Sequence, residues 1–216
     1  MRKLLYFSLF SFYLTFFVQD VHSQSFNELV KRYREAQKLE RYEDMILILD
    51  TMLAKYPNNE PEITYFNRGN TYRQVKEYKK AMSDYTKAIG IKSNYANAFN
   101  NRGISYFDLE EYEKAVSDYT IVIKYKPDYP LAYFNRANAY TCLFDYDRAI
   151  ADYTKAIELK PDFADAYYNR GNKYYGISSY KEAIQDWEKV IKLDSAYELE
   201  LRNKIDEAKY QMDKKK

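Results

Sequence analysis

The sequence predicts an all-α protein built as a linear array of helical pairs. A pattern of 34 residues recurs four times, over residues 62–95, 96–129, 130–163 and 164–197. Within each copy the apolar residues recur at the spacing of a helix and not in strand-like alternation. Glycine and proline number only five each among 216 residues, too few for a turn-rich β protein. These three observations favour helices throughout the repeated part of the chain.

The first 23 residues are expected to be a signal peptide and not part of the fold. Basic residues 2–3 precede an apolar run over residues 4–18, and Ser23 then ends a stretch that resembles a cleavage site. The alternative is an uncleaved membrane anchor. The fifteen-residue run would rise only roughly 22 Å as a helix, short of a hydrocarbon core of about 30 Å. We therefore expect a secreted or periplasmic chain that begins at Gln24, membrane-anchored only if the segment is retained.

Each strict copy is interpreted as two helices separated by a short break. The first helix carries an Asn-Arg-small triplet, and the second carries an alanine followed four residues later by an aromatic ring. Asp145 and Ser179 are good N-cap types for second helices, whereas Pro127 and Pro161 should end them. The triplets are Asn67-Arg68-Gly69, Asn101-Arg102-Gly103, Asn135-Arg136-Ala137 and Asn169-Arg170-Gly171, and the second-helix rings are Tyr85, Tyr119, Tyr153 and Trp187.

This pattern resembles the tetratricopeptide repeat (TPR) family, whose repeats are 34 residues long. The match covers the family's small residue at position 8, its aromatic residues at positions 11 and 24 and its alanine at position 20. The resemblance implies a right-handed α-solenoid, a TPR domain over residues 24–216. Position 15 is often glycine in the family, so we expect a local difference in the turn between the helices here. The residues at that position are Lys76, Glu110, Phe144 and Ser178.

Both ends of the array are expected to be atypical because a terminal repeat lacks one neighbour. Residues 26–59 are interpreted as a degenerate copy in which Tyr33 replaces the small residue and Met45 replaces the alanine. Residues 198–213 are expected to form an amphipathic capping helix that shields the last repeat. Its apolar stripe would consist of Tyr197, Leu201, Ile205, Ala208 and Met212.

The arginine at position 7 of each copy has two interpretations. In an antiparallel pair with its turn near positions 15–16, position 7 lies opposite position 23, which is always aspartate. We therefore predict four ion pairs within repeats, and the alternative is a basic ladder that binds a partner. The predicted pairs are Arg68–Asp84, Arg102–Asp118, Arg136–Asp152 and Arg170–Asp186.

The family resemblance implies that first helices line a concave groove that holds a ligand. Here the implied groove is a row of asparagines beside aromatic and apolar side chains. Asparagine offers two donors and an acceptor, which suits an extended peptide backbone, although the same amides could instead bond neighbouring helices. The candidate peptide-binding residues are Phe66, Asn67, Asn70, Asn100, Asn101, Ile104, Phe134, Asn135, Asn138, Tyr168, Asn169 and Asn172.

The sequence favours a protein–protein interaction scaffold that binds a peptide or protein in its groove. The alternatives are self-association as a structural component of the cell envelope and, more remotely, a membrane-tethered adaptor. Some TPR domains hold acidic chaperone C-termini with a two-carboxylate clamp. This chain supplies asparagines of that clamp but lacks its cations at positions 2 and 5, so we do not expect that ligand.

Composition argues against catalysis, cofactors, metals and nucleic acid. The only histidine, His22, lies in the expected signal, and Cys142 is the only cysteine, so His-based catalysis, zinc sites and an internal disulfide are not expected. No glycine-rich phosphate loop is present. The formal net charge of +2 gives the chain no electrostatic reason to seek nucleic acid or anionic lipid.

Overall fold

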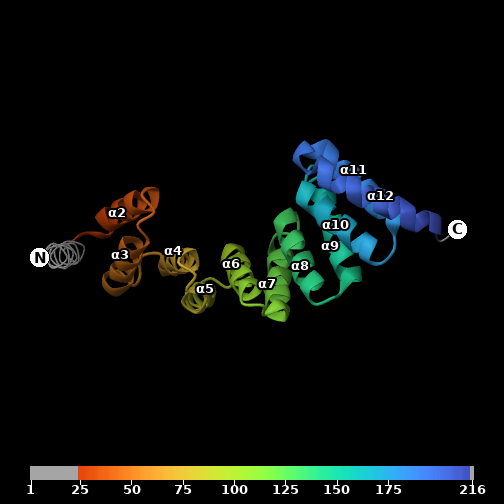
Figure 1. Cartoon of the computed structure of the whole chain (residues 1–216). Coiled ribbons are helices and arrows are strands. Elements are labelled where there is room, and N and C mark those ends of the chain that lie inside the picture. The colour runs from red at the N-terminus through yellow and green to blue at the C-terminus, as the bar shows by residue number, and fades with distance from the viewer. Residues whose placement is uncertain (1–23, 215–216) are drawn as a thin grey trace, which may run out of the picture. The chain divides into compact units, whose positions relative to one another are not determined.

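Residues 24–214 are described by a computed structural model, and they form α-helices joined by short connections (Figure 1). Strands are absent from this part of the chain, which confirms the predicted all-α class. None of its helices is long and apolar enough to cross a bilayer. The expected signal peptide and its cleavage site lie outside the described residues and remain predictions.

The helices follow one another in consecutive pairs. The pairs are α2 (Phe26–Lys38) with α3 (Tyr42–Lys55), α4 (Pro61–Gln74) with α5 (Tyr78–Ile91), α6 (Ala96–Asp108) with α7 (Tyr112–Tyr125), α8 (Pro130–Cys142) with α9 (Tyr146–Leu159), and α10 (Ala164–Gly176) with α11 (Tyr180–Leu193). A 3-10 turn, η1 (Ser195–Tyr197), leads into the last helix, α12 (Glu198–Lys214).

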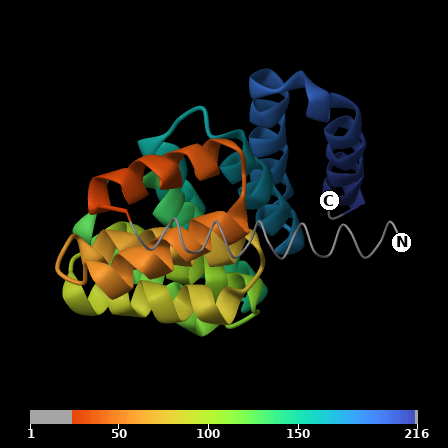
Figure 2. The ribbon, with the colours of Figure 1, turned by 90° about the vertical axis from the view of Figure 1, so that its left-hand side faces the viewer.

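The chain divides into two compact units, and the division falls inside α6, between Ser105 and Tyr106. In the first unit α2 packs on α3, α3 on α4, and α4 on α5 (Figure 2). The α2–α3 pair has its own core, which includes Leu29, Ile48 and Met45. Met45 stands where the other copies have alanine, and Ile48 stands where they have aspartate, so this terminal pair departs from the repeat pattern in its core.

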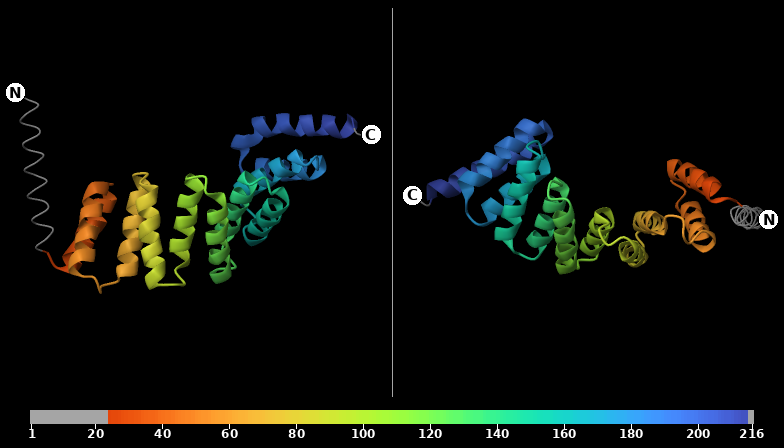
Figure 3. Two further views of the ribbon diagram at one scale, coloured as in Figure 1. Left: turned by 90° about the horizontal axis from the view of Figure 1, so that it is seen from below. Right: turned by 180° about the vertical axis from the view of Figure 1, so that it is seen from behind.

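In the second unit each helix from α7 to α12 packs on the next (Figure 3). Tyr153 and Phe163 belong to the core around α8 and α9, and Trp187 belongs to the core around α11. Helix α12 covers α11 and buries Leu201 and Ile205 against it. This arrangement confirms the expected capping helix, because its apolar stripe faces the last pair and most of its charged side chains are exposed.

Close approach of the paired helices explains the small residue at position 8. A Cβ added to Gly69 would lie 2.7 Å from Cε1 of Tyr85, and one added to Gly171 would lie 2.8 Å from Nε1 of Trp187. Both distances are shorter than real carbon contacts, so either ring would have to move. The glycines thus let a large ring of the second helix lie flat against the first helix.

The turn between the helices of a pair has the same backbone geometry in every pair, although position 15 carries no glycine. The expected difference from the family's turn remains a prediction. The residue at position 15 adopts left-handed backbone geometry, with φ of 61° at Lys76 and 60° at Phe144. The next residue closes the turn by donating its N–H to a carbonyl five residues back, as Glu77 does to Tyr72 at 2.8 Å. Main-chain bonds therefore impose this geometry without glycine, at a cost of about 1–2 kcal/mol per turn.

The predicted helix ends are confirmed in three of four cases. Oδ1 of Asp145 accepts the N–H of Arg148 at 3.2 Å, and the second helices end two residues before Pro127 and Pro161. Ser179 was expected to cap α11 with its side chain, but it forms no such bond. Glu77 lacks one too, because the main-chain closure of the turn already orders the start of these helices.

Candidate peptide-binding surface

The arginines at position 7 join helices within each unit. Nε and Nη2 of Arg136 donate to the two carboxylate oxygens of Asp152 at 2.7 and 2.8 Å. Its Nη1 donates to Thr120 of the preceding repeat at 3.0 Å. Arg68 and Arg170 form the same bidentate pairs with their own aspartates, at 2.7–2.8 Å. Three of the four predicted ion pairs are thus present. The fourth would join residues of the two units and remains a prediction.

Burial shows that these arginines are structural. The side chain of Arg170 is 15% exposed and that of Asp186 is 6% exposed. Burial opposes the charge of Arg170, but its bonds to Asp186 outweigh this, so the pKa of Arg170 is raised. Burial also raises the pKa of Asp186, although Arg170 acts against it. The alternative of a basic ladder for a partner is therefore disfavoured, because the guanidinium groups are already engaged and shielded.

In the first unit the candidate asparagines meet around one tyrosine hydroxyl. Oη of Tyr85 donates to Oδ1 of Asn70 at 2.9 Å, and Nδ2 of Asn101 donates to the same oxygen at 2.7 Å. Nδ2 of Asn100 in turn donates to Oδ1 of Asn101 at 3.1 Å. The network ties α4 to α5 and α6. Two donors fill the acceptor capacity of Asn70, and its NH₂ group forms no hydrogen bond with any described residue.

The second unit repeats this arrangement. Oη of Tyr153 donates to Oδ1 of Asn138 at 2.6 Å, and Nδ2 of Asn169 donates to the same oxygen at 3.1 Å. Again the NH₂ group of Asn138 has no partner among residues 24–214. Burial raises the pKa of Tyr153 to about 12, and Tyr85 is affected in the same way. Both hydroxyls therefore stay protonated as donors at neutral pH.

The candidate phenylalanines pack on rings of the second helix and of the connection that follows it. The ring of Phe66 lies 5.0 Å from that of Tyr95 and 6.0 Å from that of Tyr85, measured between centroids. Phe134 stacks in the same way on Phe163, at 4.8 Å. Both phenylalanines remain half-buried. They are thus fixed in position while part of each ring stays open to solvent beside the amides.

Comparison with known sequences agrees with this geometry. The tetratricopeptide repeat profile matches residues 63–95, 130–163 and 164–197, and a related TPR repeat profile matches residues 105–141. The chain belongs to the tetratricopeptide repeat family. No protein of curated function matches it.

Solved structures show the same TPR fold at low sequence identity. A crystal structure of MamA is 24% identical with a TM-score of 0.72, and the match covers 76% of this chain and 95% of that one. A tetratricopeptide repeat protein from Parabacteroides merdae is 22% identical with a TM-score of 0.76, covering 88% of this chain and 75% of that one. MamA from Desulfovibrio magneticus is 18% identical with a TM-score of 0.73, covering 79% and 95%. These likenesses support the solenoid fold and say nothing of the ligand.

The last TPR repeat replaces the tyrosine hydroxyl by a lysine from the capping helix. Trp187 occupies the ring position, and its Nε1 is buried without a hydrogen-bond partner. Nζ of Lys204 instead reaches Oδ1 of Asn172 at 3.4 Å and Oη of Tyr168 at 3.0 Å. Asn172, Trp187 and Lys204 line a hollow of about 290 Å³ together with Glu207. Two candidate residues of α10, Tyr168 and Asn172, therefore contact α12, whereas Asn169 contacts the preceding repeat through Asn138.

The remaining candidates lie on the same helices but in different surroundings. Asn67 lines a pocket of about 270 Å³ between α2, α3 and α4, whereas Ile104 and Asn135 are half-buried on α6 and α8. Sequence reasoning missed the position-24 hydroxyls, which hold the asparagines in place. The spacing could have indicated them: Tyr85 follows Asn70 by fifteen residues, one fewer than the Arg–Asp spacing, so the same antiparallel pair brings the two residues together.

Proposed function

We propose that this chain is an exported TPR scaffold that binds an extended peptide or protein segment along its first helices. Proteins of this family generally act as scaffolds and not as enzymes, and we propose the same here. The observation that carries the proposal is the paired state of the asparagines. In Asn70 and Asn138 the oxygen is saturated by two neighbours, and the NH₂ group is left with two donors.

This arrangement favours the carbonyl oxygens of a peptide backbone as ligands. The tyrosine fixes the orientation of each amide, so little side-chain entropy is lost when the NH₂ group meets an acceptor. Phe66 and Phe134 add apolar area next to the donors, and rings contribute such area at low entropic cost. An uncharged row of donors beside rings fits an extended segment without a required charge.

The test separates the ligand role of the amide from its structural role. The change Asn138→Asp keeps the oxygen that Tyr153 and Asn169 bond, but it removes the NH₂ donors. We expect the tagged chain to keep its helical circular dichroism and to lose partners captured from an envelope fraction, and Phe134→Ala should weaken capture further. The matched control, Lys181→Ala with Gln185→Ala on exposed positions of α11, should capture them unchanged. Equal capture by all variants would refute the groove assignment.

Export is tested by the N-terminus of the chain isolated from cells. A chain that begins at Gln24 supports a secreted or periplasmic scaffold. A chain that retains Met1 supports the membrane-tethered adaptor. Soluble protein in the cytoplasm with an intact N-terminus would contradict both.

Self-association is a second candidate function, which two exposed apolar side chains favour. Phe144 is 79% exposed and Leu199 is 80% exposed, on the turn after α8 and in α12 of the same unit. Exposed rings and leucines of this kind are common in contacts between copies of a chain. Light scattering over a range of concentrations tests it, with Phe144→Ser and Leu199→Ser as variants. A monomer at every concentration would contradict self-association.

A further inference from the structure

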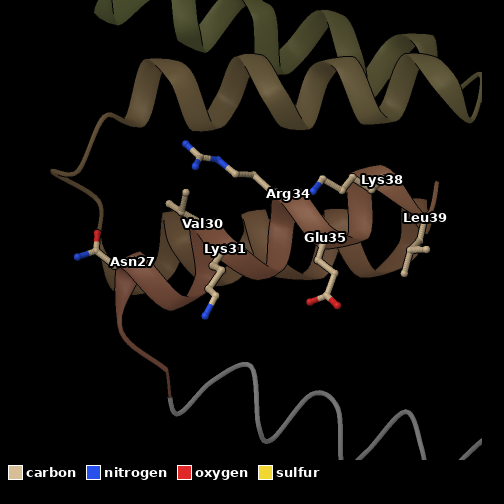
Figure 4. Close-up of a pocket in the computed structure, with 7 residues that line it drawn as sticks. All are labelled: Asn27, Val30, Lys31, Arg34, Glu35, Lys38 and Leu39. Carbon is tan, nitrogen blue, oxygen red and sulfur yellow. The ribbon is translucent and has the colours of Figure 1, made fainter.

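Helix α2 presents three cations along one stripe, whereas the corresponding stripe of α4 consists of the amides Asn67, Asn70 and Gln74. Lys31, Arg34 and Lys38 follow one another at spacings of three and four residues, and all three are exposed. None of their side chains forms an ion pair or hydrogen bond with any residue in 24–214. Figure 4 shows Arg34 and Lys38 directed to one edge of α2, with Lys31 and Glu35 directed to the other.

The repeat register places this stripe on the candidate binding wall. In the degenerate copy that begins at Phe26, Lys31, Arg34 and Lys38 occupy positions 6, 9 and 13. Positions 6 and 9 are the same ones that carry Asn67 and Asn70 in the next copy. The wall of the first unit therefore changes from amides on α4 to cations on α2.

A pocket with one apolar side lies between the two parts of this wall. It has a volume of about 270 Å³ and lies between α2, α3 and α4. Val30, Met52 and Ile63 form its apolar side, whereas Arg34, Glu60 and Asn67 form its polar side. Arg34 and Val30 border both this pocket and the exposed stripe in Figure 4. A segment held here would meet a charge and an apolar recess within one side-chain length.

We infer that α2 and this pocket bind an acidic segment of the partner, with carboxylates against Lys31, Arg34 and Lys38 and one apolar side chain in the recess. This inference rests on the proposed scaffold function and adds the chemistry of the ligand. Charge complementarity selects the acidic segment, because the three cations outnumber the two neighbouring carboxylates, Glu35 and Glu60, and leave this surface with a net positive charge. The recess selects a peptide over a polyphosphate chain, since phosphates supply no apolar group to fill it.

Fluorescence anisotropy tests the inference with labelled synthetic peptides. The probe alternates pairs of glutamate with single leucines, and its counterpart carries glutamine in place of every glutamate. We expect the glutamate peptide to bind the full chain about tenfold more tightly, because a few exposed charge pairs together produce a change of that size. Raising the salt concentration from about 0.1 M to about 1 M should remove the difference, since the Debye length falls from about 10 Å to about 3 Å.

Charge reversal locates the site. The triple variant Lys31→Glu, Arg34→Glu and Lys38→Glu should lose the preference for the glutamate peptide. A control with the same change in net charge reverses three exposed residues of second helices and should bind as the unchanged chain does. Its changes are Lys79→Glu, Lys124→Glu and Lys181→Glu. Unfolding temperatures compared across the variants exclude a loss of fold as the cause.

Three results would overturn the inference: equal binding of the two peptides, equal loss in the control variant, or tighter binding of single-stranded DNA or anionic vesicles through the same three residues. Its failure is distinguishable from failure of the proposed scaffold function. If the acidic peptide does not bind but Asn138→Asp still loses captured partners, only the acidic ligand is wrong. If the peptide binds and Asn138→Asp changes nothing, the amide wall is wrong and the cationic site stands.

Discussion

The Arg136–Asp152 pair provides the most direct test of how the repeats are held together. The pair is bidentate at 2.7 and 2.8 Å, and its side chains are only 17% and 9% exposed. Replacing Asp152 by alanine leaves a shielded guanidinium without its counter-charge. We expect a loss of about 3–5 kcal/mol of unfolding free energy, as is typical when one partner of a buried pair is removed.

A double-mutant cycle measures the coupling itself. Arg136→Met combined with Asp152→Leu should cost far less than the sum of the single changes, because the apolar pair leaves no uncompensated charge. The coupling energy should exceed about 2 kcal/mol by urea unfolding, provided that the slope with denaturant stays constant. The matched control is Lys155–Glu158 on the same helix, whose side chains are 46% and 59% exposed. It should give about 0.5 kcal/mol or less. Equal coupling in the two pairs would refute the structural role of the buried pair.

Three further predictions concern the backbone and the buried rings. Gly69→Ala should destabilise the fold by about 1–3 kcal/mol, because its Cβ would meet Tyr85 at 2.7 Å. Gly90→Ala has open space around its Cβ and should stabilise α5 by about 0.5–1 kcal/mol. Thermal unfolding measures both, and changes of stability with the same sign would contradict the packing argument. Lys76→Gly should stabilise the chain by about 0.5 kcal/mol because it relieves the strain of a φ of 61°, whereas Lys79→Gly inside α5 should cost about 1 kcal/mol. Urea unfolding measures both, and a loss of stability in both variants would exclude strain in the turn. Burial raises the pKa of Tyr85 from 10.0 to about 12, so its contribution to the free energy of unfolding, roughly 3 kcal/mol for each such tyrosine, is present below pH 10 and is lost as the pH rises towards 12. The ultraviolet absorbance that reports ionisation of the hydroxyl should therefore change together with the loss of helical circular dichroism. Ionisation before unfolding would contradict burial.

Much of the local architecture could be predicted because it depends on spacing along the chain. The sixteen-residue separation of Arg136 and Asp152 indicates their pairing, since an antiparallel pair with a fixed turn brings those two positions together. The apolar stripe of residues 198–213 indicates a cap for the same kind of reason. Each prediction needs only helical periodicity and the place of one turn.

Two features could not be predicted from spacing alone: the geometry of the turn and the hydrogen bonds of the asparagines. Lys76 lacks the glycine that its φ of 61° would favour, so propensity pointed to a different turn. The main-chain hydrogen bonds that close the turn between the two helices impose the left-handed geometry without glycine. For Asn70 the residue type allowed both a ligand role and a structural one. The hydroxyl of Tyr85 shows that the oxygen has the structural role, and the ligand role of the NH₂ group remains a prediction.

By itself the sequence determined the helical class, the register of the repeats, the small residues beneath the rings and the Arg–Asp pairing, because all of these follow from periodic positions on neighbouring helices. Only the tertiary structure decided which atoms of the asparagines are occupied, that Lys204 takes over from a tyrosine hydroxyl at the last repeat, and that Arg34 of α2 lines a pocket with an apolar side. These features depend on how side chains from several helices meet in space, and the distances between such side chains cannot be read from periodic positions along the sequence.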